Sequence, residues 1–334
     1  MTIRHSVIGL LILQPLLFAP VLAEEDDAET QARKKQLEER MVEYRTLLRE
    51  TLLQYGEMAQ NHEFDYSTTE LDERLNQERV IQSLPFGFTP HERNYILPVS
   101  YSSYPNRTSF EAIDSEASMQ PLEIKFQLSM KIPVMTDLFN DKGTLFFAYT
   151  QTSWWQAYNN EASKPFRETN YKPELFLTLE NDIRFLGFTN SYNRIGYAHQ
   201  SNGRNLPLSR SWNYLYVSSA LSKGNWMLEL TPRVRIPGMG GEDNNPDLEK
   251  YIGYVDLSLA YANNDFEYIL SAKGSFEDDG HGGLQLDWSF PIKGKMRGLV
   301  QVYAGYGESL IDYNHENYRF SLGLQFTNQL LGSK

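Results

Sequence analysis

The sequence predicts an all-β fold, a 12-stranded antiparallel transmembrane β-barrel with an N-terminal helical extension. From about Asn94 onward, apolar and polar residues alternate with period two; read as a helix, residues 123–132 would spread apolar side chains around the whole circumference. The alternating runs number about twelve, an even count, and long and short connections alternate between them. Aromatic residues make up 13% of the chain, yet the mean hydropathy is −0.50. This combination is typical of strands with a single apolar face.

Residues 1–23 are predicted to be a secretory signal peptide. Arg4 and His5 form a basic start, residues 7–22 form an apolar core, and the segment ends in small residues at Ala23, where cleavage is expected. A signal anchor is the alternative, but the apolar core is short and contains two prolines. We therefore expect an exported protein.

The composition excludes several classes of function. The chain has 31 Lys and Arg against 43 Asp and Glu, a formal net charge of −12, which argues against nucleic acid as a partner. It has no cysteine, so disulfide frameworks, thiolate catalysis and Cys-ligated metals are excluded.

Residues 24–93 are predicted to be a periplasmic helical extension and linker that precede a barrel domain at 94–331. Within residues 29–60, apolar residues follow the three-four spacing of one amphipathic helix, which packs on its own domain or lies loose. A short coiled coil is the alternative. The polar residues 61–82 are predicted to be linker.

The connections between the predicted strands differ in length in a regular way. Those after odd-numbered strands are mostly longer than those after even-numbered strands. Because short turns face the periplasm in outer-membrane barrels, both termini are expected there, with the fifth strand rising toward the cell exterior. The predicted strands are residues 94–104, 123–132, 144–155, 172–180, 183–200, 212–221, 226–234, 255–261, 266–276, 284–290, 299–306 and 320–326.

Charged residues occupy positions that the alternation turns toward the barrel lumen, where they could form a polar network that fills it. A catalytically silent outer-membrane barrel, serving as a pore, an adhesin or a structural protein, is the alternative class of function, and ion conductance would separate a pore from an enzyme. The lumen-facing charges are Lys125, Lys131, Glu229, Asp256 and Asp287.

One stretch, residues 196–204, has the chemistry of a catalytic site. His199 and Ser201 stand two apart, so on a strand their side chains share one face, and a hairpin brings Asn213 toward the imidazole. A nucleophile, a base and an orienting group would then be neighbours. Their parity places all three on the apolar, lipid-facing side together with Ile195. Polar groups there favour a substrate that is itself in the membrane, such as a lipid ester.

The chemistry that these residue types favour is acyl transfer. Ser201 would attack the ester carbonyl, His199 would take its proton and return it to the leaving alcohol, and Asn213 would hold the imidazole tautomer. The backbone amide of Gly203, two residues beyond the serine in a turn, is a natural donor to the oxyanion.

Five separated motifs carry a resemblance to a known family. They are YAHQSNGR at 197–204, SRSWN at 209–213, TQTSWWQ at 150–156, PFRETNY at 165–171 and GYGESLIDY at 305–313. In this order they resemble outer membrane phospholipase A, the detergent-resistant phospholipase A family, from about Asn94 to the C-terminus.

The resemblance implies a calcium-dependent enzyme of the outer membrane that hydrolyses sn-1 and sn-2 acyl esters of glycerophospholipids and lysophospholipids. It implies a Ser-His-Asn triad that matches Ser201, His199 and Asn213, an active site toward the outer leaflet, and an active homodimer. It also implies that calcium is bound by the main-chain carbonyl of Arg204 and by Ser209, with Ser163 of the partner subunit. Gln151 matches a polar residue of the family's dimer interface.

The sequence departs from the family pattern in three places. Leu206 stands where the family often has an acidic residue of a calcium site, although an acidic loop with Glu242, Asp243 and Asp247 is expected on the same outer side, as calcium ligands or as solvated loop. The chain does not end in an aromatic residue, which barrels usually do, and the helix predicted at 29–60 has no counterpart in the pattern.

Overall fold

The computed structural model forms two compact units, residues 1–65 with 83–86 and residues 66–82 with 87–334. The residues that it describes are 33, 35–37, 39–43, 46, 69–82, 87–114, 118–237, 243–293 and 296–330. In the first unit the described residues are helical, within the predicted helix 29–60, and the Thr46 hydroxyl donates to the Val42 carbonyl at 3.0 Å. The rest of that helix, the predicted signal peptide and residues 61–68 of the predicted linker lie outside the described residues.

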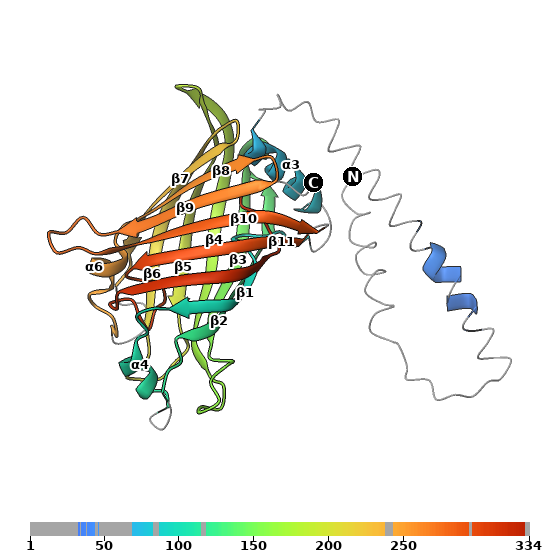
Figure 1. Ribbon diagram of the computed structural model, residues 1–334. Helices are drawn as coiled ribbons and strands as arrows, with labels where there is room; N and C mark the ends of the chain where they lie inside the picture. The colour runs from blue at the N-terminus through green and yellow to red at the C-terminus, as the bar shows by residue number, and fades with distance from the viewer. Residues whose placement is uncertain are drawn as a thin grey trace. The chain divides into compact units, whose positions relative to one another are not determined.

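Twelve antiparallel strands close into one barrel in the second unit, as the sequence predicts (Figure 1). Each strand pairs with its neighbours in the sequence, and β1 pairs with β12 through partners such as Tyr95 and Gln325. The closed ring leaves no unpaired strand edge. The strands are β1 (Tyr95–Ser102), β2 (Leu122–Asp137), β3 (Gly143–Trp155), β4 (Phe166–Phe185), β5 (Phe188–Ser201), β6 (Ser211–Lys223), β7 (Trp226–Arg235), β8 (Val255–Asn263), β9 (Phe266–Gly274), β10 (Gly282–Lys293), β11 (Met296–Gly305) and β12 (Asn317–Gln325).

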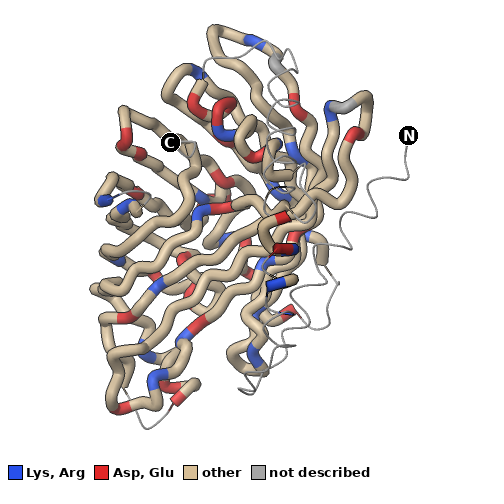
Figure 2. Tube along the Cα trace, turned by 90° about the vertical axis from the view of Figure 1, so that its right-hand side faces the viewer, with Lys and Arg blue, Asp and Glu red and all other residues tan. Residues whose placement is uncertain are grey.

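The barrel is polar inside and apolar outside. On β2 the inward Glu123, Lys125 and Lys131 are buried, whereas the alternating Leu128 and Met130 are 50% and 44% exposed. Charged residues of both signs therefore lie along the strands as well as in the loops (Figure 2). An apolar outer surface on a closed sheet suits a barrel surrounded by lipid.

Ion pairs fill much of the lumen. Arg167 contacts Glu123 at 3.0 Å, and Arg319 contacts Glu308 at 2.8 Å. The five lumenal charges predicted from the sequence follow the same pattern: Asp287 is buried and pairs with Arg93 at 2.8 Å, and Asp256 pairs with Arg233. The interior thus combines this polar network with clusters of inward apolar and aromatic side chains, such as Phe176 and Trp212.

The connections are long at one end of the barrel and short at the other, as predicted. We call these the loop end and the turn end. Three short helices lie in connections, namely α4 (Arg107–Glu111), α5 (Leu138–Asp141) and α6 (Leu248–Ile252). The long connections are residues 103–121, 156–165, 202–210, 236–254, 275–281 and 306–316, and the short ones are 138–142, 186–187, 224–225, 264–265 and 294–295.

The predicted boundary between the fourth and fifth strands is wrong. Residues 183–185 belong to β4, and the turn to β5 is at Leu186 and Gly187, both of which have positive φ. Asparagine is common in turns, but Asn181 lies at an irregularity in the β4–β5 register. There its side-chain amide donates to Asn190 at 2.6 Å. A polar residue in a bulge therefore resembles a turn in the sequence.

Part of the predicted linker is also helical. Helix α3 (Glu70–Gln82) begins after Thr69, whose hydroxyl accepts a hydrogen bond from the amide of Asp72 at 3.3 Å, and it has acidic residues in its first turn. Its described contacts are with the turn end of the barrel: the amide of Glu70 donates to the carbonyl of Gly224, between β6 and β7.

The contacts of α3 with the barrel are largely ionic. Leu71 packs among inward residues that include Tyr192 and Met227, while Glu78 is buried between Arg74 and Lys131. A helix held by a single buried leucine and an ion-pair cluster has no apolar stripe, which explains why its sequence resembled a linker.

None of the helices in the described part of the chain is both long and apolar enough to cross a membrane.

Candidate active site

His199 and Asn213 face each other across two neighbouring strands. They are register partners on β5 and β6, and the imidazole Nδ1 lies 2.8 Å from the side-chain carbonyl oxygen, Oδ1, of Asn213. In this orientation Nδ1–H donates and Nε2 carries the free lone pair. The pair therefore has the geometry of a base held by an orienting group.

The two side chains lie on the outward face of the barrel. Ile195 and Leu215, which share their parity, are 54% and 47% exposed, whereas the alternating Ala198 and Trp212 are buried in the lumen. The imidazole consequently faces the surroundings of the barrel and not its interior.

Ser201 is the last residue of β5 and has the same parity as His199. It pairs with Ser211 on β6 and with Tyr171 on β4, at the loop end. Among the described residues no hydrogen bond joins its hydroxyl to the imidazole. The structure therefore joins the predicted base to the predicted orienting residue and leaves the predicted nucleophile two residues further along the same face.

Asn202 organises the loop of residues 202–210 that follows the serine. This buried side chain accepts hydrogen bonds from the amides of Arg204 and Arg210 at 3.3 and 3.0 Å and donates to the carbonyl of Leu208 at 2.8 Å. One amide side chain thus ties both limbs of the loop together. The sequence alone does not indicate this role of Asn202, because it depends on the loop conformation.

Gly203 lies between these anchored residues with a positive φ of 64°. A Cβ at this position would lie 3.3 Å from Cε2 of Tyr171. Within the described part of the chain its amide donates no hydrogen bond, so it is available to a ligand next to Ser201.

The predicted calcium-binding residues lie on two connections at the loop end. The main-chain carbonyl of Arg204 accepts no hydrogen bond within the described residues, and its guanidinium donates to the carbonyls of Phe166 and Arg167. The Ser209 hydroxyl accepts from Asn244 at 3.2 Å. Ser163 is exposed on the connection between β3 and β4. Both Arg204 and Ser209 offer oxygen atoms, the donors that Ca²⁺ prefers.

Gln151, the predicted interface residue, lies on β3 with the outward parity of Phe147 and Tyr149. Its amide oxygen accepts a hydrogen bond from the Tyr149 hydroxyl at 3.2 Å. Gln151 thus places a polar amide on the largely apolar outer surface of the barrel.

The described carboxylates of the acidic loop contact other side chains of the protein. Asp243 pairs with Arg235 at 2.7 Å, and Asp247 accepts a hydrogen bond from the Tyr313 hydroxyl at 2.5 Å. Glu242 lies outside the described residues, and Leu206 is exposed. The two described carboxylates are therefore already engaged by partners on the protein.

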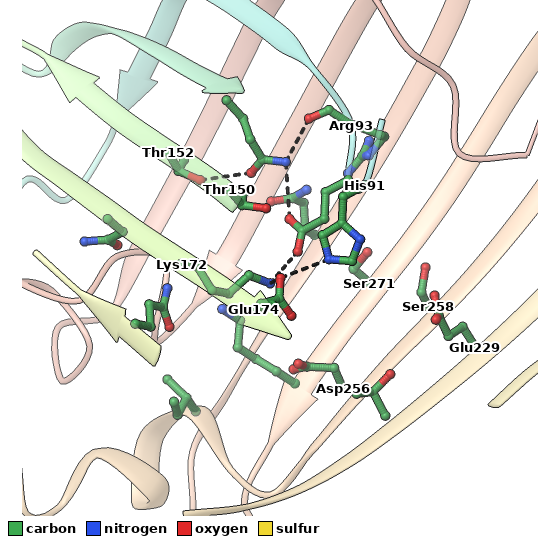
Figure 3. A pocket seen from close by; sticks show the side chains of 18 of the residues that line it. His91, Arg93, Thr150, Thr152, Lys172, Glu174, Glu229, Asp256, Ser258 and Ser271 are labelled. Carbon is green, nitrogen blue, oxygen red and sulfur yellow. Dashed lines mark hydrogen bonds and ion pairs between the residues drawn. The ribbon is translucent and has the colours of Figure 1, made fainter. Parts of the chain in front are cut away.

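A cavity of about 420 Å³ occupies the lumen behind this wall. His91 and Lys172 both point at Glu174 in it (Figure 3), at 2.9 and 3.2 Å, and Lys172 also contacts Glu92 at 2.5 Å. His91, Glu92 and Glu174 lie close enough together to hold a metal ion, but the ammonium of Lys172 already contacts both carboxylates. The cluster lies on the opposite side of the wall from His199. The sequence does not indicate it, because its members are far apart in the chain.

Comparison with known proteins gives consistent matches. The family model described as phospholipase A1 matches residues 71–326. Phospholipase A1 of Klebsiella pneumoniae is 42% identical over 245 residues, which cover 73% of this chain and 84% of that protein. An active-site mutant of outer membrane phospholipase A from Escherichia coli, in which an asparagine is replaced by alanine, superimposes with a TM-score of 0.69 and 39% identity over 74% of this chain and 94% of that chain.

A second solved structure is similar over slightly more of the chain. The outer membrane phospholipase dimer of Salmonella typhi with bound calcium gives a TM-score of 0.71 at 36% identity, and the match covers 79% of this chain and 99% of that chain. Both structural matches therefore include nearly the whole of the relative.

Proposed function

The chain belongs to the phospholipase A1 family, and from this premise we propose that it is a calcium-dependent outer membrane phospholipase A. Its substrates are the sn-1 and sn-2 acyl esters of glycerophospholipids and of lysophospholipids. The observation that carries the proposal is the 2.8 Å contact between His199 Nδ1 and Asn213 Oδ1 on the outward face, with Ser201 two residues along that face.

The reaction follows from the roles of these atoms. The Ser201 hydroxyl oxygen bonds to the ester carbonyl carbon while His199 Nε2 takes its proton, and the amide of Gly203 donates to the oxyanion. When the carbon–oxygen bond to the leaving alcohol breaks, the imidazolium returns the proton to that alcohol. Water then attacks the acyl-serine with the same base, which releases the fatty acid and restores Ser201.

The outward position of the site explains how a barrel can act on lipid. An ester that stays in the leaflet reaches the imidazole from the side, without entering the lumen. The ion-pair network that occupies much of the lumen, including the contact of Arg167 with Glu123, supports an enzyme and not an open pore. A catalytically silent barrel would have no use for a base directed at lipid.

Calcium fits the donor set at the loop end. The Arg204 carbonyl, free of hydrogen-bond donors among the described residues, and the Ser209 hydroxyl would hold it together with Ser163 of the partner subunit. Bound there, the ion would supply positive charge near the oxyanion donor. The calcium-bound dimer of the Salmonella typhi relative supports this assignment and an active homodimer, with Gln151 at the interface.

The orientation in the membrane belongs to the same proposal. The loop end faces the cell exterior, which places the site toward the outer leaflet, and the turn end with α3 faces the periplasm. Residues 1–23 act as the signal peptide, residues 24–93 form the periplasmic extension and linker, and residues 94–331 form the barrel domain.

Release of fatty acid from phosphatidylcholine in detergent tests the proposal. Wild type should release fatty acid with calcium and not with a chelator, and Ser201→Ala should release none under either condition. The proposal fails if wild type is inert with calcium, or if the alanine variant is equally active.

A further inference from the structure

The side-chain oxygen of Asn213 has a second hydrogen-bond donor besides the imidazole. The Tyr197 hydroxyl lies 2.7 Å from Oδ1, the same atom that His199 Nδ1 contacts at 2.8 Å. Tyr197 precedes His199 by two residues on β5, so it has the same outward parity and is the diagonal neighbour of Asn213 across the β5–β6 pair. A tyrosine is long enough to span that diagonal.

The Tyr197 hydroxyl depends on this one acceptor. Within the described residues it has no other hydrogen-bond partner, and its neighbours on the outward face, such as Ile195 and Leu215, are apolar and exposed. A phenol hydroxyl directed into hydrocarbon without an acceptor is unfavourable. Its proton is therefore committed to the carbonyl oxygen of Asn213.

The distinction between oxygen and nitrogen matters at an asparagine. An aspartate would present an oxygen to the imidazole in either of its two flipped orientations, but an asparagine presents Oδ1 in one and Nδ2 in the other. With Nδ2 toward the ring, Nδ1 would have to accept, and the ring proton would move to Nε2, the nitrogen that must take the proton of Ser201. The flipped amide would therefore inactivate the base.

We propose that Tyr197 is a positioning residue that holds the amide of Asn213 with its oxygen toward His199. This inference rests on the proposed function, because it assigns a role within the same reaction. Flipping the amide would remove the only acceptor of the Tyr197 hydroxyl among the described residues, so the tyrosine selects the productive orientation. Tyr197 acts through Asn213 and does not contact the reacting atoms.

The test is a double-mutant cycle on kcat and KM for detergent-solubilised phosphatidylcholine, with Tyr197→Phe and Asn213→Ala made singly and together. Tyr197→Phe should lower kcat by about five- to tenfold with KM nearly unchanged, the size of one neutral hydrogen bond. In the Asn213→Ala background the same substitution should have no further effect, because the residue through which it acts is gone.

A second background covers the case in which Asn213→Ala leaves too little activity to measure. In Asn213→Asp either orientation presents an oxygen, so Tyr197→Phe should again have no effect on kcat. The matched control is Tyr268→Phe, which removes a hydroxyl from another outward-facing tyrosine that has no hydrogen bond among the described residues, and which should match wild type.

Two results would overturn the role of Tyr197. One is a Tyr197→Phe variant with wild-type kcat, and the other is an equal loss of kcat in the wild-type, alanine and aspartate backgrounds, which would indicate a general structural role. Failure of the proposed function gives a different result, since wild type would then be inert with calcium, or Ser201→Ala would be as active as wild type, whatever residue stands at position 197.

Discussion

Glu78 on α3 lies 2.7 Å from the ammonium of Lys131, which points into the lumen from β2. The same carboxylate is 2.7 Å from the guanidinium of Arg74 one turn earlier on the helix. Lys131 is buried with it, Arg74 is partly buried, and Arg74 also donates to the carbonyl of Gln329. The contact therefore joins the helix, the barrel wall and the C-terminal segment.

Replacing Glu78 with glutamine should destabilise the protein by about 3 to 5 kcal/mol, because it leaves the buried charge of Lys131 without its partner. Denaturant unfolding in detergent, followed by tryptophan fluorescence, measures this. Glu73→Gln is the matched control, since Glu73 is an exposed residue of the same helix. Equal stability of the two variants would show that the Glu78 contact does not hold α3.

The stabilising effect of Glu78 should depend on pH. Burial alone would raise the pKa of its carboxyl above the usual 4.5, but the charges of Arg74 and Lys131 outweigh burial and lower that pKa to about 2. Because the folded pKa lies below the unfolded one, the ionised carboxylate stabilises the fold above about pH 4.5, and this stabilisation is lost as the pH falls toward 2. The difference in unfolding midpoint between wild type and Glu78→Gln should shrink over that range; a constant difference would contradict the assignment.

Gly203→Ala should lower kcat by about a hundredfold or more. The added Cβ would contact Tyr171 and would strain a backbone with positive φ, so the amide that we propose as the oxyanion donor would move. Gly224→Ala is a strict control, because Gly224 also has positive φ but has open space around it and lies in a turn at the other end of the barrel. If both variants keep wild-type kcat, the Gly203 amide is not the oxyanion donor.

Ser209→Ala should raise the calcium concentration needed for half-maximal activity by roughly tenfold or more, because one oxygen donor is lost. The activity at saturating calcium should fall much less. Ser103→Ala, in a different long connection, serves as the comparison. An unchanged calcium requirement would remove Ser209 from the ligand set.

The sequence was sufficient to predict those features that depend on the strict alternation of apolar and polar residues along a strand. In a barrel surrounded by lipid, outward side chains are apolar and alternate with polar inward ones. Runs such as residues 123–132 therefore indicated both the strand and which of its faces points outward. The same parity placed His199 on the outward face, and the antiparallel hairpin brought Asn213 opposite to it. Local periodicity thus predicted most of the fold and the juxtaposition of His199 with Asn213.

Contacts between distant or irregular segments were beyond such reasoning. Helix α3 was missed because ion pairs, and not an apolar stripe, hold it, and the β4–β5 turn was misplaced because Asn181 lies in a bulge. The lumenal contact between His91 and Glu174 joins residues 83 positions apart. The bond between Tyr197 and Asn213 depends on side-chain rotamers, which alternation does not specify.

Covalent labelling tests the central claim most directly, namely that Ser201 is a nucleophile activated by His199 and open to lipid. The protein in detergent is treated with a long-chain alkyl fluorophosphonate in the presence of calcium, and the modified residue is identified by peptide mass spectrometry. One label per chain on Ser201 is predicted, with little or no labelling in His199→Ala and none in Ser201→Ala. Labelling of another residue, or equal labelling of the Ser201→Ala variant, would contradict the account.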